Sequence, residues 1–397
     1  MAAPSMRQAL GGHNRGRGTL GLAHTREFLA KVLGDDVHAR RVLSLANGVA
    51  GVLSAAALSI HAIGQGYAAL AEITPKSAVK QVDRMLSNGG IDLGVVLPLW
   101  VQFVVGDSGR AIVALDWTDF DSDDHTTLCA YLVTDKGRAT PLMWKTVKKS
   151  KLAGSRTAHE RDLIDELKAA IPDSTKVTLL ADRAFGNQDH YDLIEACGWD
   201  YVIRFRGVIR VEAAAGEAHR ADAWLSAQGK ARVIRDARVT ADRAPVGAVV
   251  VVKAARMKEA WFLATSLRDA KAADIIRLYG RRFTIEETFR DTKDPRFGLG
   301  LSATHIRDPK KRDRLLFLVA AAHTLLTLLG AACEASGLDR YLKVNTVKRR
   351  THSLFRQGSY WYSRLPTLRE EWFRPLMTAF DQIIRQHAFF ATFFGFK

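Results

Sequence analysis

Three carboxylates occupy positions from which they could together hold divalent metal ions. Asp116 and Asp182 each follow an apolar stretch that predicts a buried strand, and Glu286 lies on the polar side of a later predicted helix. Open α/β sheets place ligands at the carboxyl ends of their strands. Acids from two strands and a helix can hold two Mg²⁺ ions about 3.5–4 Å apart, one activating a water or a 3′-hydroxyl and the other stabilising the leaving oxygen. Taken singly, each acid is more often a cap or a turn residue.

The predicted helix carries four polar groups at helical spacing. In the segment YGRRFTIEETFRDTK, residues 279–293, these are Tyr279, Arg282, Glu286 and Lys293. No proline or glycine follows Gly280, so we expect a continuous helix. At about 100° per residue the four groups fall within about 60° of arc, beside an apolar stripe. Taken alone, this pattern is also compatible with a solvated face that carries helical charge pairs.

The charge of the chain favours a polyanionic partner, with nucleic acid as the first expectation. The net charge is +16, and residues 301–397 carry 16 Lys/Arg against 7 Asp/Glu. Such an excess suits phosphate backbones. Three cysteines, Cys129, Cys197 and Cys333, form no CxxC pair. We therefore expect neither a disulfide framework nor a zinc site, and a reducing cytosol fits.

Neither end of the chain nor its longest apolar run predicts a membrane protein. The N-terminal residues 1–25 are rich in glycine and arginine, and we expect a flexible basic tail rather than a secretory signal. The run LLFLVAAAHTLLTLLGAA, residues 315–332, approaches the length of a membrane span. It contains His323 and three adjacent alanines and follows the charged segment DPKKRDR. We predict a buried helix there.

Residues 26–105 predict a helical N-terminal domain that binds DNA. Apolar residues recur there at spacings of three and four. The last segment, SAVKQVDRMLSN, has Ser77 as its expected N-cap and exposes Lys76, Lys80 and Arg84. A basic last helix often contacts DNA, and an ordinary helical bundle is the alternative.

After residue 110 the pattern changes to α/β. Three strands in succession are followed by helix, strand, helix and strand, which is the order of a ribonuclease-H-like core. We place this catalytic core at 106–206 and 266–310. An inserted β-subdomain occupies 207–265, where β patterns predominate. A helical, basic C-terminal region, 311–397, is expected to contact DNA or form a dimer.

Over roughly residues 30–365 the chain resembles the IS4-type DDE transposases of bacterial insertion sequences. The most specific feature is Tyr, two residues, Arg, three residues, Glu, six residues, Lys, which the stripe described above keeps at every spacing. ALDWTDF is similar to the first acidic motif of the family and LLADRAFG to its second. The β-rich segment also lies where the family carries an insertion. A small departure is Ala184, where the family more usually has glycine, and alanine is tolerable unless the backbone there needs a positive φ.

The resemblance implies a role for each residue of the stripe and for the acids. The implied catalytic and metal-binding triad is Asp116, Asp182 and Glu286, with two Mg²⁺ ions for which Mn²⁺ would substitute. Arg282 and Lys293 would contact phosphates beside the cleaved end, and Tyr279 would donate its hydroxyl to a phosphate. We expect Arg282 and Lys293 to be at least partly solvent-accessible without DNA, because a buried unpaired cation is costly.

For Arg183, Trp261 and the segment 348–358 the sequence leaves more than one role open. Arg183 could bind a phosphate or form a structural salt bridge. Trp261 could stack on a flipped base, as a tryptophan does in some relatives, or belong to the core. The acids Asp119, Asp121, Asp123 and Asp124 are expected to be mostly solvated loop residues. His125 and His190 have no second histidine at ligand spacing and are not expected to bind metal. The basic segment 348–358 could grip DNA, stabilise a dimer or simply be surface.

The expected function is that of a cut-and-paste DNA transposase. It would bind the terminal inverted repeats of its element, free a 3′-OH by hydrolysis and join that end to target DNA by Mg²⁺-dependent phosphoryl transfer. Its partners would be double-stranded DNA and a second copy in a synaptic dimer, with no membrane, in the bacterial cytoplasm at the nucleoid. The alternatives are a ribonuclease-H-like nuclease that only cuts and a non-catalytic DNA-binding inhibitor of transposition.

Overall fold

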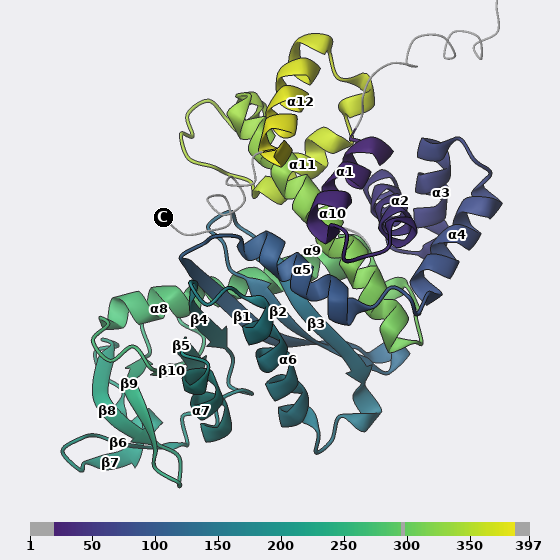
Figure 1. Ribbon diagram of the computed structural model, residues 1–397. Coiled ribbons are helices and arrows are strands. Elements are labelled where there is room, and N and C mark those ends of the chain that lie inside the picture. The colour runs from purple at the N-terminus through teal and green to yellow at the C-terminus, as the bar shows by residue number, and fades with distance from the viewer. Residues whose placement is uncertain (1–19, 295–297, 386–397) are drawn as a thin grey trace, which may run out of the picture. The chain divides into compact units, whose positions relative to one another are not determined.

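The computed structural model of the protein describes residues 20–294 and 298–385. The described chain forms two compact units. One contains the residues up to Gly90 and those from Phe317 onward, and the other contains Ile91–Leu316. The first unit is helical, and the second has a large sheet with helices around it (Figure 1). The predicted mixed α/β class is therefore confirmed.

The helical unit is built from amphipathic and apolar helices. They are α1 (Leu22–Leu33), α2 (Ala39–Ala55), α3 (Ile60–Ala71), α4 (Pro75–Ser87), α10 (Pro309–Ala335) from Phe317 onward, α11 (Leu354–Tyr362) and α12 (Glu370–Arg385). The four N-terminal helices agree with the predicted segments. Helix α1 nevertheless begins at Leu22, inside the part expected to be a tail, and residues 1–19 lie outside the described residues.

Helix α4 begins earlier than predicted. The hydroxyl of Thr74 accepts a hydrogen bond from the backbone N–H of Ser77 at 3.4 Å, so Thr74 is the N-cap and the expectation of Ser77 was wrong. Pro75 explains the shift, because its fixed φ favours the first helical position and the residue before it then caps the helix. The basic side chains of this helix are exposed, as predicted: Lys76, Lys80 and Arg84.

The long apolar run forms α10, and its apolar window is entirely buried inside the structure. Length and composition alone would allow this helix to cross a membrane. Helix α11 crosses it closely, because a Cβ on Gly330 would lie 1.9 Å from the carbonyl oxygen of Leu354, and one on Gly358 would lie 1.7 Å from that of Leu326. The predicted buried helix is confirmed.

The α/β unit supplies the elements that position the three acids. Its helices are α5 (Leu93–Val105), α6 (Arg156–Ala170), α7 (Gln188–Ala196), α8 (Ala272–Gly280) and α9 (Thr284–Lys293). Its strands are β1 (Arg110–Phe120), β2 (His125–Leu132), β3 (Thr140–Lys148), β4 (Lys176–Ala181), β5 (Asp200–Arg204), β6 (Arg210–Glu212), β7 (Ala218–Arg220), β8 (Arg232–Val239), β9 (Ala244–Val252) and β10 (Trp261–Thr265).

The strands form one sheet in the order β3-β2-β1-β4-β5-β10-β9-β8-β6-β7. β1 pairs antiparallel with β2, β2 pairs antiparallel with β3, and β1, β4 and β5 are parallel. The apolar runs of β1 and β4 suit this central position, because a strand covered on both faces carries few polar residues.

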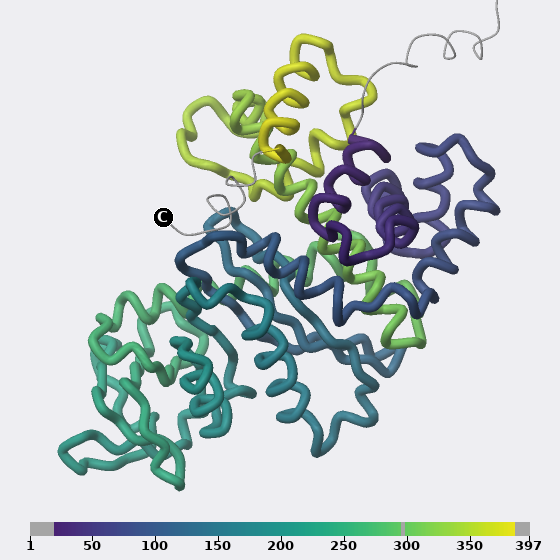
Figure 2. The backbone as a smooth tube through the Cα atoms, in the orientation of Figure 1, coloured from purple at the N-terminus to yellow at the C-terminus, as the bar shows by residue number. Residues whose placement is uncertain are grey.

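The segment predicted as an insertion continues this sheet. The chain leaves the parallel strands after β5, forms β6 to β9 and returns through β10, which pairs antiparallel with β5 (Figure 2). A 3₁₀ turn, Ala221–Trp224, lies between β7 and β8. The β character of this segment is as predicted, and its strands join the sheet of the core through β10.

The segment 279–293 is not one continuous helix. Helix α8 ends at Gly280, a 3₁₀ turn follows at Arg281–Phe283, and α9 begins at Thr284. The prediction of an unbroken helix was therefore wrong. The spacing argument treats every residue as 100° of rotation, and a 3₁₀ turn winds more tightly. Tyr279, Arg282 and Glu286 nevertheless lie together, whereas Lys293, about two turns further along α9 than Glu286, has other partners.

Candidate active site

The parallel pairing of β1 with β4 brings two of the three acids next to each other. The last paired residues of the two parallel strands are Leu115 and Ala181, and the next residues along the chain are Asp116 and Asp182. Neighbouring strands lie about 4.8 Å apart, so the two carboxylates start from adjacent backbone positions. The predicted placement at a strand end holds for Asp182, which follows the last residue of β4, but Asp116 lies inside β1, because that strand continues to Phe120 in its pairing with β2.

Each of these acids also accepts a backbone hydrogen bond. The N–H of Trp117 donates to Asp116 Oδ1 and the N–H of Ala184 donates to Asp182 Oδ1, both at 2.9 Å. Ala184 is not among the non-glycine residues with a positive φ. The alanine at this position therefore carries no backbone strain, and the departure from the pattern of the family has no structural penalty.

The pleat of β1 separates two environments. Successive side chains in a strand point to opposite faces. Thr118 lies on the same face as Asp116 and meets Lys293, whereas Trp117 points the other way and donates to Glu160 of α6 at 2.6 Å. Helices α6 and α9 therefore contact opposite faces of this strand.

Arg282 joins two acids of the predicted triad. Its Nη1 lies 3.0 Å from Asp116 Oδ2, and its Nη2 lies 2.8 Å from Glu286 Oε1. Arg282 is only 6 % exposed, so the expectation that it would be solvent-accessible was wrong. The cost argument behind that expectation holds only for an unpaired cation, and this one has two carboxylate partners.

The burial of this cluster shifts its protonation. Burial raises the pKa of Asp116 to about 6, although Arg282 opposes that shift, and the charge of Asp182 adds to it. Burial also disfavours the charge of Arg282, but Tyr279 and the carboxylates outweigh it and raise the pKa of the guanidinium. Arg282 therefore stays charged, and its field acts on all three acids.

Tyr279 and Trp261 belong to an aromatic cluster around Arg282. The ring of Trp261 lies 5.0 Å from that of Tyr279 and 5.9 Å from that of Phe283, with which it stacks. Tyr279 is buried, Trp261 is partly exposed and Phe283 is exposed. Burial raises the pKa of the Tyr279 hydroxyl. The structure thus places Trp261 beside the candidate site.

Lys293 takes a different position on the stripe. Its Nζ donates to the hydroxyl of Thr118 at 3.1 Å and to the carbonyl of Asp119 at 2.6 Å, and it lies 4.6 Å from the ring centre of Phe120. Burial lowers the pKa of this ammonium, and Asp119 partly offsets the effect. Lys293 remains partly exposed, which agrees with the prediction.

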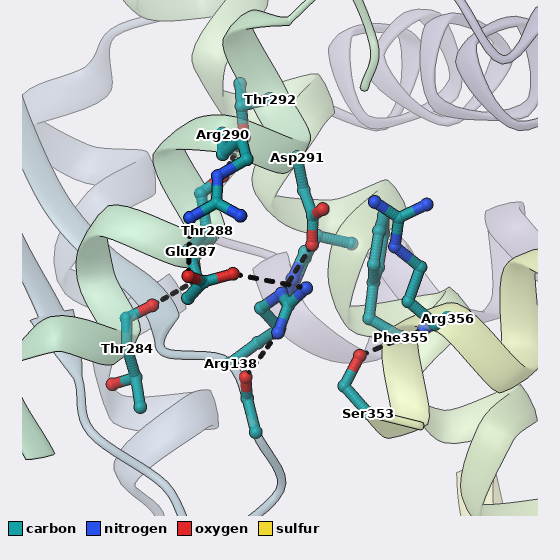
Figure 3. A network of polar contacts seen from close by, with 12 residues as sticks. Arg138, Thr284, Glu287, Thr288, Arg290, Asp291, Thr292, Ser353, Phe355 and Arg356 are labelled. Atoms are coloured by element: carbon teal, nitrogen blue, oxygen red, sulfur yellow. Dashed lines mark hydrogen bonds and ion pairs between the residues drawn. The ribbon is translucent and has the colours of Figure 1, made fainter. Parts of the chain in front are cut away.

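Helix α9 is held by the connection between β2 and β3. Figure 3 shows Arg138 between two acids of α9, with Nε 2.5 Å from Asp291 Oδ2 and Nη2 3.7 Å from Glu287 Oε2. The hydroxyl of Thr288 accepts from the N–H of Ala139 and donates to its carbonyl, both at 3.0 Å. These contacts fix the helix that carries Glu286. Arg138 had no motif or spacing that could have identified it.

A second buried arginine lies beyond the end of β1. Arg312 Nη2 lies 2.5 Å from Asp123 Oδ2, and its Nε donates to His125 Nδ1 at 2.9 Å. His125 Nε2 lies 3.1 Å from the carbonyl oxygen of Arg307, which fits a tautomer with the proton on Nε2. Asp123 is therefore a buried ion-pair partner and is the exception among the four acids, which were expected to be mostly solvated.

The other acids of that cluster agree better with the expectation. Asp119 and Asp121 both bind the ammonium of Lys149, and Asp124 accepts from Ser150. On the opposite face, Glu160 is buried and lies 3.1 Å from Nε2 of His190. His190 thus has a carboxylate partner.

Arg183 is exposed. Among residues 20–294 and 298–385 it has no ion pair, so the salt-bridge alternative has no support there. Its positive charge lowers the pKa of Glu259, behind the larger effect of Arg204. The side chain is free to meet an anionic ligand.

The donor types suit a hard divalent cation. Asp116, Asp182 and Glu286 offer carboxylate oxygens, the ligands that Mg²⁺ prefers. Within the described part of the chain, no three His, Cys, Asp or Glu side chains stand close enough together to hold a metal ion as they are. Arg282 provides the physical reason, because its guanidinium lies between Asp116 and Glu286.

The comparison with protein families covers this same region. Residues 107–325 match the family model described as the transposase DDE domain, which is more than half of the 397 residues. No curated protein matches the chain. The matched segment includes Asp116 and Asp182, Arg282, and the helix that carries Glu286. By this match the chain belongs to the DDE-domain transposase family.

Proposed function

We propose that this transposase is of the IS4 type and performs cut-and-paste transposition. The observation that carries the proposal is the junction of Asp116, Arg282 and Glu286 beside the strand that ends at Asp182. The strand order β3-β2-β1-β4-β5, with the first two pairings antiparallel and the last two parallel, supports a ribonuclease-H-like core. The intact Tyr, Arg, Glu and Lys spacing supports the subtype.

The acidic side chains of the site would bind metal, and the basic ones would position the DNA. Asp116, Asp182 and Glu286 would hold two Mg²⁺ ions, with Mn²⁺ substituting. When bound, such ions polarise the scissile phosphate and generate an oxygen nucleophile near neutral pH. Lys293 and the exposed Arg183 would hold phosphates of the DNA backbone, which positions the strand without reading its sequence.

The aromatic cluster would provide a surface for a base. Phe283 is exposed and Trp261 is partly exposed, and the two rings stack. A base that leaves the duplex next to the cleavage point can stack on such rings. Tyr279 is buried beneath them, and its proposed contact with a phosphate would require the cluster to open.

The remaining partners are proposed from charge. The exposed face of α4 would contact DNA through Lys76, Lys80 and Arg84. The exposed basic residues Lys348 and Arg349 would contact DNA or a second subunit. We propose that two copies pair the terminal inverted repeats in a synaptic dimer, in the bacterial cytoplasm at the nucleoid.

Cleavage and joining of end DNA test this function. The substrate is a duplex with the short inverted repeats that flank the gene, supplied with Mg²⁺ and a target plasmid. The wild type is expected to release a 3′-OH end and to form joined product. Asp116→Ala, Asp182→Ala and Glu286→Ala should each lose cleavage by at least about 10³-fold, while end binding is retained.

Two results would overturn the proposal. Cleavage without any joined product would mean a nuclease that only cuts. Binding without metal-dependent cleavage by the wild type would mean a non-catalytic DNA-binding protein. Asp162→Ala is the matched control, because this exposed acid lies on α6 and pairs with Lys145, so its activity should equal that of the wild type.

A further inference from the structure

The guanidinium of Arg282 occupies the place where two acids of the site converge. It spans Asp116 and Glu286 with separate nitrogens, at 3.0 and 2.8 Å. Its third donor, Nε, is buried and has no hydrogen-bond partner within residues 20–294 and 298–385. A buried donor without a partner costs about 1–3 kcal/mol. Arg282 is therefore well paired in charge but not fully satisfied in hydrogen bonding.

A guanidinium and a divalent cation cannot use this place together. Mg²⁺ binds oxygen at about 2.0–2.1 Å, which is shorter than the nitrogen–oxygen distance of a hydrogen bond. Both are positively charged, and the oxygens that face Arg282 belong to two of the three acids proposed to bind the ion. The arginine must move before Asp116 and Glu286 can hold a metal ion together.

The surroundings of Arg282 are open to solvent on one side, so its side chain can move toward the surface. Glu286 has 49 % of its side chain exposed, so one end of the bridge lies at the surface. Phe283, whose ring lies 5.0 Å from the guanidinium carbon, is also exposed. A phosphate at this surface could accept two parallel hydrogen bonds from the fork of Arg282, including one from Nε.

Lys293 shows that this arrangement is not a general property of the stripe. Its ammonium is also partly buried, but its acceptors are the hydroxyl of Thr118 and the carbonyl of Asp119. Neither hydrogen bond of its Nζ goes to one of the three acids. A metal ion at those acids would leave both of its hydrogen bonds in place.

We propose that Arg282 is a gate that keeps the acids from binding metal until DNA is present. In the DNA-free protein it bridges Asp116 and Glu286. A backbone phosphate of bound DNA then takes over the guanidinium and frees both carboxylates. Metal and DNA therefore bind with positive coupling, and the enzyme without DNA binds metal weakly. This inference rests on the proposed metal role of the three acids.

The test is the affinity for Mn²⁺ of the full-length protein, by calorimetric titration without DNA and again with a saturating duplex. Arg282→Gln removes the bridging charge and should bind Mn²⁺ at least about tenfold more tightly than the wild type without DNA. Arg282→Lys cannot span both acids and should lie between the two. Lys293→Gln is the matched control and should remain within about twofold of the wild type.

Phosphate oxygens of the duplex add ligands in both proteins, so the duplex should raise the Mn²⁺ affinity of the wild type at least about tenfold more than that of Arg282→Gln. Equal Mn²⁺ affinity in the wild type and in both Arg282 variants, each with a wild-type melting curve, would overturn the gate. An equal gain in Lys293→Gln would reduce the effect to general charge and would also overturn it. Asp182→Asn separates the two proposals, because unchanged Mn²⁺ affinity in that variant means that the acids are not a metal site at all.

Discussion

Two buried arginines lie beside β1 and make ion pairs of similar geometry, yet their surroundings differ. Arg312 is fully buried, and its carboxylate partner Asp123 is 3 % exposed. Arg282 is nearly as buried, but its partner Glu286 has half of its side chain in solvent. Each guanidinium also has one buried nitrogen, Nη1 of Arg312 and Nε of Arg282, without a hydrogen-bond partner among the described residues, so the exposure of the carboxylate partner is the feature that differs.

The difference shows what a buried ion pair can and cannot reveal. Such a pair is weak evidence for stability by itself, because desolvation offsets much of the attraction. The exposure of the partner is more informative. A pair enclosed on every side, such as Arg312–Asp123, can only serve the fold. A pair with one end at the surface, such as Arg282–Glu286, can exchange its partner for a ligand.

The largest expected effect is loss of stability when the enclosed pair is broken. Arg312→Met leaves Asp123 buried without its cation and should lower the free energy of unfolding by about 3–5 kcal/mol. Arg282→Met should lower it by about 1–2 kcal/mol, because Glu286 can be hydrated in place and Asp116, whose pKa burial already raises to about 6, can take up a proton. Urea unfolding of both variants, followed by tryptophan fluorescence, measures the difference. Equal losses would remove the distinction between the two arginines.

A smaller effect is expected at the contacts that hold α9. Arg138→Ala removes a cation 2.5 Å from the buried carboxylate of Asp291 and should destabilise the protein by about 2–3 kcal/mol. Arg290→Ala is the control on the same helix, since this exposed residue pairs only at the surface with Glu287 and should lose less than about 0.5 kcal/mol. Thermal melting of the two variants decides, and a large loss in Arg290→Ala would contradict the assignment.

The smallest expected effect is a pH dependence of stability caused by Asp313, the residue after Arg312. Burial raises the pKa of Asp313 to about 7, although the hydrogen bond from the N–H of Thr146 opposes the shift. Because its folded pKa lies above the unfolded value, its stabilising contribution is complete below about pH 4 and is lost as the pH rises through 7. The side chain keeps some contact with solvent, so we expect a change on the order of 2 kcal/mol.

Asp313→Asn is the comparison for that measurement. Its amide oxygen can still accept from Thr146, but it has no proton to lose. The stability of the wild type relative to this variant should therefore fall between pH 4 and pH 8. A difference that does not change with pH would mean that Asp313 is ionised throughout.

Much of the architecture could be predicted because it depends on local patterns. The apolar runs before Asp116 and Asp182 identify both strands, since a buried strand leaves little choice of residue. Ordinary helical periodicity identified the amphipathic helices. The 3₁₀ turn at Arg281–Phe283 was not predicted, because Gly280, which directly precedes it, was taken as part of a continuous helix.

The environment of each arginine could not be predicted, because it depends on contacts between distant segments. Arg312 lies within DPKKRDR beside the exposed Lys310, and nothing in the residue types separates the two. Its partners Asp123 and His125 stand nearly two hundred residues earlier. Likewise, the pairing of Arg282 with Asp116 spans 166 residues. Only the assembled sheet brings these charges together.

The proposed exchange of Arg282 between the acids and a DNA phosphate is tested most directly by a crystal structure of the protein with Mn²⁺ and duplex end DNA. We expect Mn²⁺ to be bound by oxygens of Asp116. The guanidinium of Arg282 should lie on a DNA phosphate, outside hydrogen-bond distance of Asp116 and Glu286. In the same crystal Arg312 should still bind Asp123. Mn²⁺ on the three acids with both contacts of Arg282 kept, or an Arg312 that has left Asp123, would contradict it.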